Sequence, residues 1–154
     1  MLIAKNVYLH FADQALDGMS AILRTLGDEL ANKRPDLPGA NSPYAIVTHC
    51  LGVLNFWAGG LVAGREVVRD REAEFTASGP VEELVSRVEA AKLRFHEDVT
   101  TADPSAPLRK EPHPAYQDTP AGLTQGGALQ HVYEELAQHH GQLEVTRDLL
   151  TANG

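Results

Sequence analysis

Four long segments carry apolar residues at three- and four-residue steps, and this periodicity constrains the fold of the chain most. Such spacing places apolar side chains on one face of an α-helix. The segments cover roughly residues 4–31, 42–64, 80–99 and 124–151, and strand-like alternation is nearly absent. The sequence therefore predicts an all-α four-helix bundle, formed by one domain spanning residues 1–154.

Proline and glycine residues delimit the predicted helices. Ser42 can cap the second helix, with Pro43 at its first position and Gly64 as its stop. Gly79-Pro80 precedes the third helix. Five prolines between residues 100 and 124 prevent a regular helix there, so we expect a long irregular loop before the last helix. The loops differ in length, and the second is long enough to cross over the bundle.

The charge balance excludes two classes of partner. The chain has 13 Lys and Arg against 21 Asp and Glu, a formal net charge of −8. Proteins that bind nucleic acid or anionic lipid use clustered basic residues, so we expect no nucleic-acid partner and no membrane surface. No uninterrupted apolar run is long enough for a membrane span. A single cysteine, Cys50, cannot form an internal disulfide, which favours a reducing cytoplasm.

The last helix carries a pattern that can bind metal. Glu135 and His139 are four residues apart, a rise of about 6 Å, so their side chains can meet on one helix face. His131 lies one turn before Glu135 and offers an alternative pair with it. His131 and His139 are about 12 Å apart along the axis, too far to share one ion. The spacing alone leaves both pairs open.

A further ligand must come from another helix. His49 lies at the edge of the apolar face of the second helix. If that helix neighbours the last one, His49, Glu135 and His139 form a His₂Glu set, the three-ligand pattern of catalytic zinc. Nickel, iron or manganese would accept the same ligands. Cys50 points about 100° away from His49 on a helix and is expected to be a small buried apolar residue.

Three short motifs resemble those of the DinB/YfiT-like superfamily of four-helix metal-binding proteins. They are Glu135-Leu-Ala-Gln-His139-His140-Gly141-Gln142, Thr48-His49 with Leu51 and Trp57, and the connector Arg69-Asp70-Arg71-Glu72-Ala73-Glu74-Phe75. The resemblance is greatest to the branch of mycothiol-dependent maleylpyruvate isomerase and bacterial thiol S-transferases, which has glutamate at the position of Glu135. His140 stands where many members have arginine.

The resemblance implies a DinB-like bundle with a divalent metal, zinc first, held by His49, Glu135 and His139. It also implies a transferase or isomerase-like enzyme that activates a low-molecular-weight thiol for reaction with a small electrophile. Mycothiol comes from the resemblance alone, and bacillithiol and glutathione are alternatives. A non-catalytic metal-binding stress-response bundle and a metal-assisted hydrolase are the other hypotheses.

Substrate contacts are predicted near the mouth of this site. The candidates are two arginines of the connector and three residues of the proline-rich loop: Arg69, Arg71, His113, Tyr116 and Asp118. A guanidinium can hold a carboxylate through two hydrogen bonds, although Arg69 and Arg71 are also expected to pair with Glu72 and Glu74 at the surface. The outer faces of the first and third helices could form a homodimer.

Overall fold

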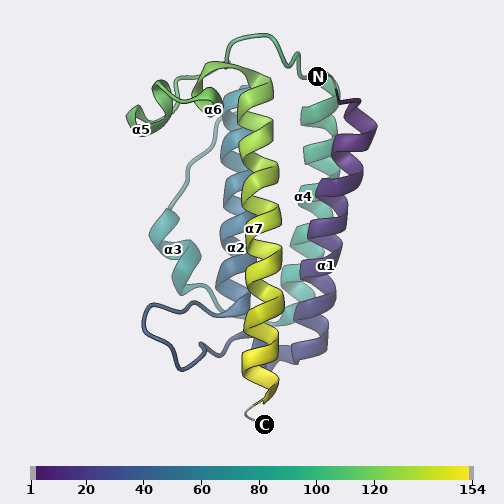
Figure 1. Ribbon diagram of the computed structural model, residues 1–154, viewed down its shortest axis with the longest axis vertical. Helices are drawn as coiled ribbons and strands as arrows, with labels where there is room; N and C mark the ends of the chain where they lie inside the picture. The colour runs from purple at the N-terminus through teal and green to yellow at the C-terminus, as the bar shows by residue number, and fades with distance from the viewer. Residues whose placement is uncertain (1–2, 153–154) are drawn as a thin grey trace.

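Four helical rods pack side by side in the computed structural model, which describes residues 3–152 (Figure 1). They are α1 (Lys5–Ala31), α2 (Pro43–Val53) continued by the π-helix η1 (Leu54–Val62), α4 (Val81–Thr101) and α7 (Gln125–Ala152). Three shorter helices are α3 (Arg71–Thr76), α5 (Pro114–Gln117) and α6 (Pro120–Leu123). No strand occurs among the described residues, so the predicted all-α fold is confirmed.

The rod formed by α2 and η1 contacts both α7 and α4, and α1 contacts the same two helices. The second and last long helices are therefore neighbours, as the candidate metal site requires. The four rods close around one apolar core. Its largest fully buried side chains include Phe95, Leu16, Met19, Leu23 and Leu136.

The connection between η1 and α4 runs back along the bundle (Figure 1). Asn32, at the end of α1, accepts a hydrogen bond from Gly79 N and donates one to Gly79 O, which places the start of α4 beside the end of α1. Lys5 Nζ donates to Thr100 O at 2.8 Å at the opposite end. Hence α4 runs parallel to the preceding rod, and residues 63–80 must cross over, as the loop length suggested.

Several local features differ from the sequence-based expectation. The second helix changes to π-helical hydrogen bonding at Leu54 and ends at Val62. Gly64 follows two residues later, and its φ of 79° suits glycine. The connector holds the short helix α3, because Asp70 accepts a hydrogen bond from Ala73 N and caps it. Val7 and Phe11 share the three- and four-residue apolar spacing of the first helix, yet they are 43% and 50% exposed.

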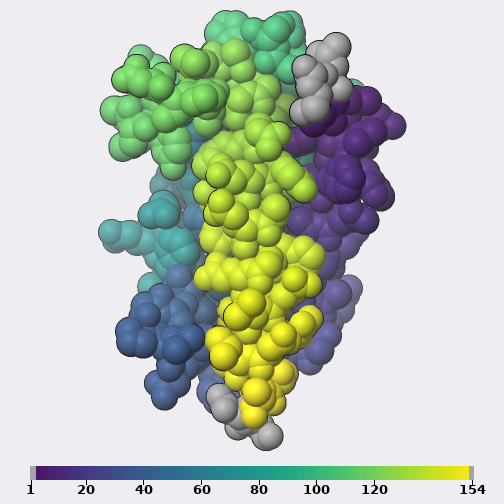
Figure 2. Space-filling view, viewed as in Figure 1, coloured from purple at the N-terminus to yellow at the C-terminus, as the bar shows by residue number. Residues whose placement is uncertain are grey.

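The proline-rich segment before α7 is only partly irregular, since it contains α5 and α6. In the space-filling view, residues in the range 100–124 form the mass that overhangs one end of the bundle (Figure 2). Gln125 at the start of α7 anchors this segment, because its Nε2 donates to Pro107 O and its Oε1 accepts from Asp103 N. The segment therefore closes the end of the bundle near η1.

One stretch, Pro43–Val62, has the length and apolar character of a membrane span. Its best window has a mean hydropathy of 1.5, but 83% of that window is buried inside the bundle. A core helix of a soluble fold has these properties because neighbouring helices cover it on all sides. The burial thus accounts for the apolar character without a membrane.

Replacing the cap of α2 tests how this rod begins. Ser42 is buried and accepts a hydrogen bond from Ala45 N at 3.2 Å. We expect Ser42→Ala to lower the free energy of unfolding by about 1 kcal/mol, measured by urea denaturation. Ser78→Ala, at an exposed position, is the matched control and should leave stability unchanged. Equal stability of the two variants would contradict the capping role.

Candidate metal centre

The three residues predicted as ligands lie on two neighbouring helices and converge. His49 comes from α2, and Glu135 and His139 come from α7. One ligand atom from each lies within 4.8 Å of the others. Glu135 Oε2 is 3.3 Å from His49 Nε2 and 3.3 Å from His139 Nε2. His49 is buried, whereas the two α7 residues are half-buried.

The far side of each imidazole is held by a hydrogen-bond acceptor. His49 Nδ1 lies 2.8 Å from Glu74 Oε2, and His139 Nδ1 lies 2.8 Å from Gln142 Oε1. These oxygens can only accept, so each Nδ1 carries the proton and donates. In a neutral imidazole, the lone pair is then on Nε2, facing Glu135. Three ligand atoms that converge on one point fit the ligand chemistry of a divalent metal.

The pKa shifts of Glu135 and His139 agree with a site that binds a cation. Hydrogen bonds from His139, and next from His49, hold the pKa of Glu135 well below its ordinary value, although partial burial acts in the opposite sense. The same Glu135 carboxylate raises the pKa of His139. The group therefore keeps its carboxylate ionised and stabilises positive charge, whether a proton or a metal supplies it.

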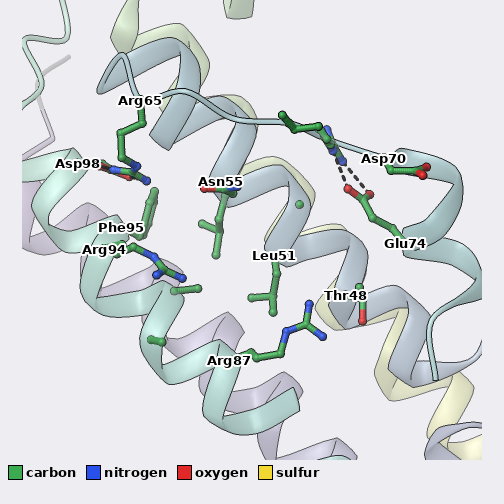
Figure 3. Close-up of a pocket in the computed structure, with 16 residues that line it drawn as sticks. Thr48, Leu51, Asn55, Arg65, Asp70, Glu74, Arg87, Arg94, Phe95 and Asp98 are labelled. Atoms are coloured by element: carbon green, nitrogen blue, oxygen red, sulfur yellow. Dashed lines mark hydrogen bonds and ion pairs between the residues drawn. The ribbon is translucent and has the colours of Figure 1, made fainter. Parts of the chain in front are cut away.

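The carboxylate that holds His49 Nδ1 belongs to a buried ion pair between Glu74 and Arg69. Arg69 donates to Glu74 Oε1 through Nε at 2.7 Å and to Oε2 through Nη2 at 3.0 Å. Figure 3 shows this pair as dashed lines beside α2. The Arg69 and Glu74 side chains are 16% and 8% exposed. This corrects the expectation that Arg69 would pair with Glu74 at the surface, because the pair is buried and uses the Nε/Nη2 edge of the guanidinium. Contact of Arg69 with a substrate stays a prediction.

Glycine at position 52 makes room for this pair. A Cβ atom there would overlap the Glu74 carboxylate. Gly52 lies one turn after His49 on α2, so the carboxylate rests directly on the helix that carries the ligand. The absence of a side chain at Gly52 is thus part of how Glu74 reaches His49 Nδ1.

His131, the alternative partner of Glu135, lies beside the group. Its Nδ1 is 3.1 Å from Glu134 Oε2, and its Nε2 is 3.8 Å from Glu135 Oε1. Its ring packs against Trp57 and Tyr116, with centroids 4.6 and 5.4 Å away. Among residues 3–152, the group that could hold a metal joins Glu135 to His139 and to His49 of α2, so the geometry favours the Glu135–His139 pair over the His131–Glu135 pair.

The remaining substrate candidates surround the group at different distances. Arg71 is exposed, with its guanidinium 5.3 Å from the Phe75 ring, and that ring stacks on His49 at 4.8 Å. The Tyr116 ring contacts the His131 ring, which lies beside the ligand group. His113 is exposed and accepts a hydrogen bond from Ala115 N, which starts α5. Contact of Arg71, Tyr116 or His113 with a substrate stays a prediction.

Cys50 does not join the ligand group in the part of the chain that the structure describes. It is fully buried, and burial raises the pKa of its thiol. A protonated, enclosed thiol is a poor nucleophile and a poor metal ligand. Cys50 therefore acts as a small core residue, as its position on the helix suggested.

Sequence reasoning missed the two residues that orient the histidines. Glu74 lies in a charged stretch, where a carboxylate is normally solvated. The local signal that could have drawn attention to Glu74 is Asp70, which lies four residues earlier and can cap a short helix containing Glu74. Gln142 was visible as the residue three positions after His139, within side-chain reach on the same helix face.

Comparisons with known proteins agree with this architecture. A sequence model described as the DinB superfamily matches residues 12–143. Among solved structures, a conserved protein from Enterococcus faecalis superposes with a TM-score of 0.75 over 99% of both chains at 13% identity. At that identity, the match shows the fold alone. No curated protein matches the sequence significantly.

Removing the charge behind His49 should weaken metal binding without removing a ligand. We expect Glu74→Gln to lower the affinity for zinc by about 10- to 100-fold, because a neutral amide orients the imidazole less well. Glu72→Gln, an exposed neighbour on α3, is the matched control. Competition with a chromogenic chelator measures both. Equal zinc affinity in the two variants would show that Glu74 does not support the site.

The close approach at Gly52 gives a second test. Gly52→Ala should displace Glu74 and weaken zinc binding by about tenfold or more, while alanine favours the helix itself. Gly141→Ala is the control, because a Cβ there meets no atom within 4 Å. The readouts are zinc affinity and the thermal midpoint. Unchanged affinity in Gly52→Ala would mean that the carboxylate is not held against α2.

Proposed function

The chain belongs to the DinB superfamily, and from this premise we propose that it is a metal-dependent transferase that joins a low-molecular-weight thiol to a small electrophile. The observation that supports the proposal is the convergence of two imidazole Nε2 atoms on one oxygen of Glu135. The ligands would be His49, Glu135 and His139. When bound, a divalent metal such as zinc supplies a Lewis acid that lowers the pKa of a coordinated thiol.

Three protein ligands leave a coordination position for a small molecule, which is typical of catalytic rather than structural sites. Within the described residues, the group contains no fourth His, Cys, Asp or Glu. The half-buried positions of Glu135 and His139 leave that side accessible. These features favour catalysis over a closed, purely structural site.

In this proposal, His131 accepts the thiol proton. Its Nδ1 donates to Glu134, so the Nε2 lone pair faces the Glu135 side of the group. In the proposed reaction, the S–H bond breaks, the proton goes to His131 Nε2, and the sulfur lone pair forms a bond to the electrophilic carbon. For an addition, the π bond of the electrophile breaks, its electron pair moves to the adjacent carbon, and that carbon takes the proton from His131. For a displacement, the leaving group departs with the bonding pair, and His131 releases its proton to solvent.

The walls beside His131 fit an apolar electrophile. Trp57 and Tyr116 form an edge-to-face aromatic pair with centroids 4.8 Å apart, and both rings contact His131. The Phe75 ring stacks on His49. Arg71, whose guanidinium lies over Phe75, would supply positive charge for an acidic substrate or thiol. Mycothiol is the first thiol to test, and the cytoplasm is the expected location.

Metal content and thiol transfer test the proposal together. Elemental analysis of untagged protein should give about one metal per chain, lost in His49→Ala and retained in Cys50→Ser. Zinc-loaded protein is then mixed with mycothiol, bacillithiol or glutathione and with 1-chloro-2,4-dinitrobenzene, and product absorbance is followed. His131→Gln should keep its metal and lose about 100-fold in rate, the size of a general-base contribution.

The possible outcomes test the metal site, the transferase reaction and the role of His131 separately. No metal after reconstitution would contradict the metal site. Bound metal with no reaction of any of the three thiols would contradict the transferase and leave a non-catalytic binding protein. Full activity in His131→Gln would exclude His131 as the proton acceptor while leaving the metal site intact.

A further inference from the structure

A second cavity lies on the other side of α2 from the metal ligands. Its volume is about 630 Å³, and its walls come from α2, η1, the connector and α4 (Figure 3). His49, Glu135 and His139 are not among the residues that line it. Arg69 and Glu74 contribute to both places, so this ion pair forms part of the partition between them.

Four arginine side chains line the cavity, in a chain whose net charge is −8. Two of them are neutralised. Arg65 makes a bidentate pair with Asp98, and Arg69 makes one with Glu74. The third acidic residue of the lining, Asp70, accepts the capping hydrogen bond of α3. Every carboxylate of the lining therefore already has a partner.

Arg87 and Arg94 have no such partner. Neither makes a hydrogen bond or an ion pair with any residue in the described range 3–152. Both come from α4, two turns apart, and both guanidinium groups point across the cavity toward α2 (Figure 3). Two unpaired cations thus face one hollow, and their exposed side chains leave it open to solvent.

The floor between these cations is apolar, with one polar group at its edge. Leu51 and Phe95 are buried and line the cavity, and Ala91 lies between the two arginines on α4. Asn55 lies across from Arg94 in Figure 3, and its amide also has no hydrogen-bond partner in the described part of the chain. A ligand that complements this surface has a negatively charged group and a hydrocarbon body.

We propose that this cavity binds a small organic acid, with the carboxylate held by Arg87 and Arg94 and the apolar body resting on Leu51 and Phe95. A guanidinium matches a carboxylate in geometry as well as charge, and a charge-assisted hydrogen bond is stronger than a neutral one. The apolar floor gains from excluding water. The inference does not depend on the metal or on thiol transfer.

The test is a titration of the purified protein with benzoate, with backbone amide NMR signals as the readout. Saturable shifts are expected in residues 48–55 and 87–98. Benzyl alcohol has the same ring without the charge, and inorganic phosphate has charge without the apolar body; both should bind at least about tenfold more weakly. Phthalate, a dicarboxylate, shows whether the two arginines can hold two carboxylates at once.

Charge-removing variants assign the site. Arg87→Gln and Arg94→Gln should each weaken benzoate binding by about tenfold. Arg147→Gln makes the same change outside the cavity, on α7, and should bind benzoate as the unmodified protein does. All three positions are at least partly exposed, so circular dichroism should show an unchanged fold.

Four results of the binding measurements and one result of the NMR mapping would overturn the proposal. The binding results are the absence of saturable benzoate binding, equal affinity in the two α4 variants and the unmodified protein, equal binding of benzyl alcohol, and equal binding of phosphate. Shifts confined to residues 131–142 would also overturn it, because they would place the anion at the metal centre. Metal content is not a readout here, so failure of either proposal is recognised separately.

Discussion

The buried ion pair between Arg69 and Glu74 is the interaction on which the arrangement of the site depends. The Glu74 side chain is 8% exposed, and a carboxylate buried to this extent would be costly without partners, because it loses its hydration. Glu74 regains those interactions from two Arg69 N–H groups and from His49 Nδ1. One carboxylate therefore fixes the crossover connection against α2, sets the proton position on His49, and separates the metal centre from the cavity behind it.

The helix order explains why this connection is available at all. Since α4 runs parallel to the rod that precedes it, residues 63–80 must return along that rod. The return path brings Arg65 and Arg69 to one side of α2 and Phe75 to the other. A tight hairpin between antiparallel helices would leave His49 without its outer carboxylate. The long connection is thus a structural requirement of the site.

The sequence predicted the fold well because helical periodicity and the caps at Ser42 and Gly64 depend on neighbouring residues only. It also placed Glu135 and His139 on one helix face for the same reason. It could not decide between His131 and His139 as the partner of Glu135, since that depends on which of them lies beside His49 on the neighbouring helix. The burial of Glu74 depends on Gly52, which lies 22 positions earlier and has no local pattern to mark it. The π-helical turn η1 likewise has no signal in the apolar spacing.

The charge balance of the ligand group bears on what it can bind. A dication held by one carboxylate and two neutral imidazoles keeps one positive charge, so an anionic ligand such as a thiolate neutralises it. Glu74 would cancel this preference if its charge were free, because it contacts His49 directly. Its pairing with Arg69 removes that effect while keeping the hydrogen bond to Nδ1. Arg69 therefore neutralises the charge of Glu74 while leaving Glu74 able to orient His49. In the proposed function, this neutralisation would let an anionic thiolate bind close to a second acidic residue.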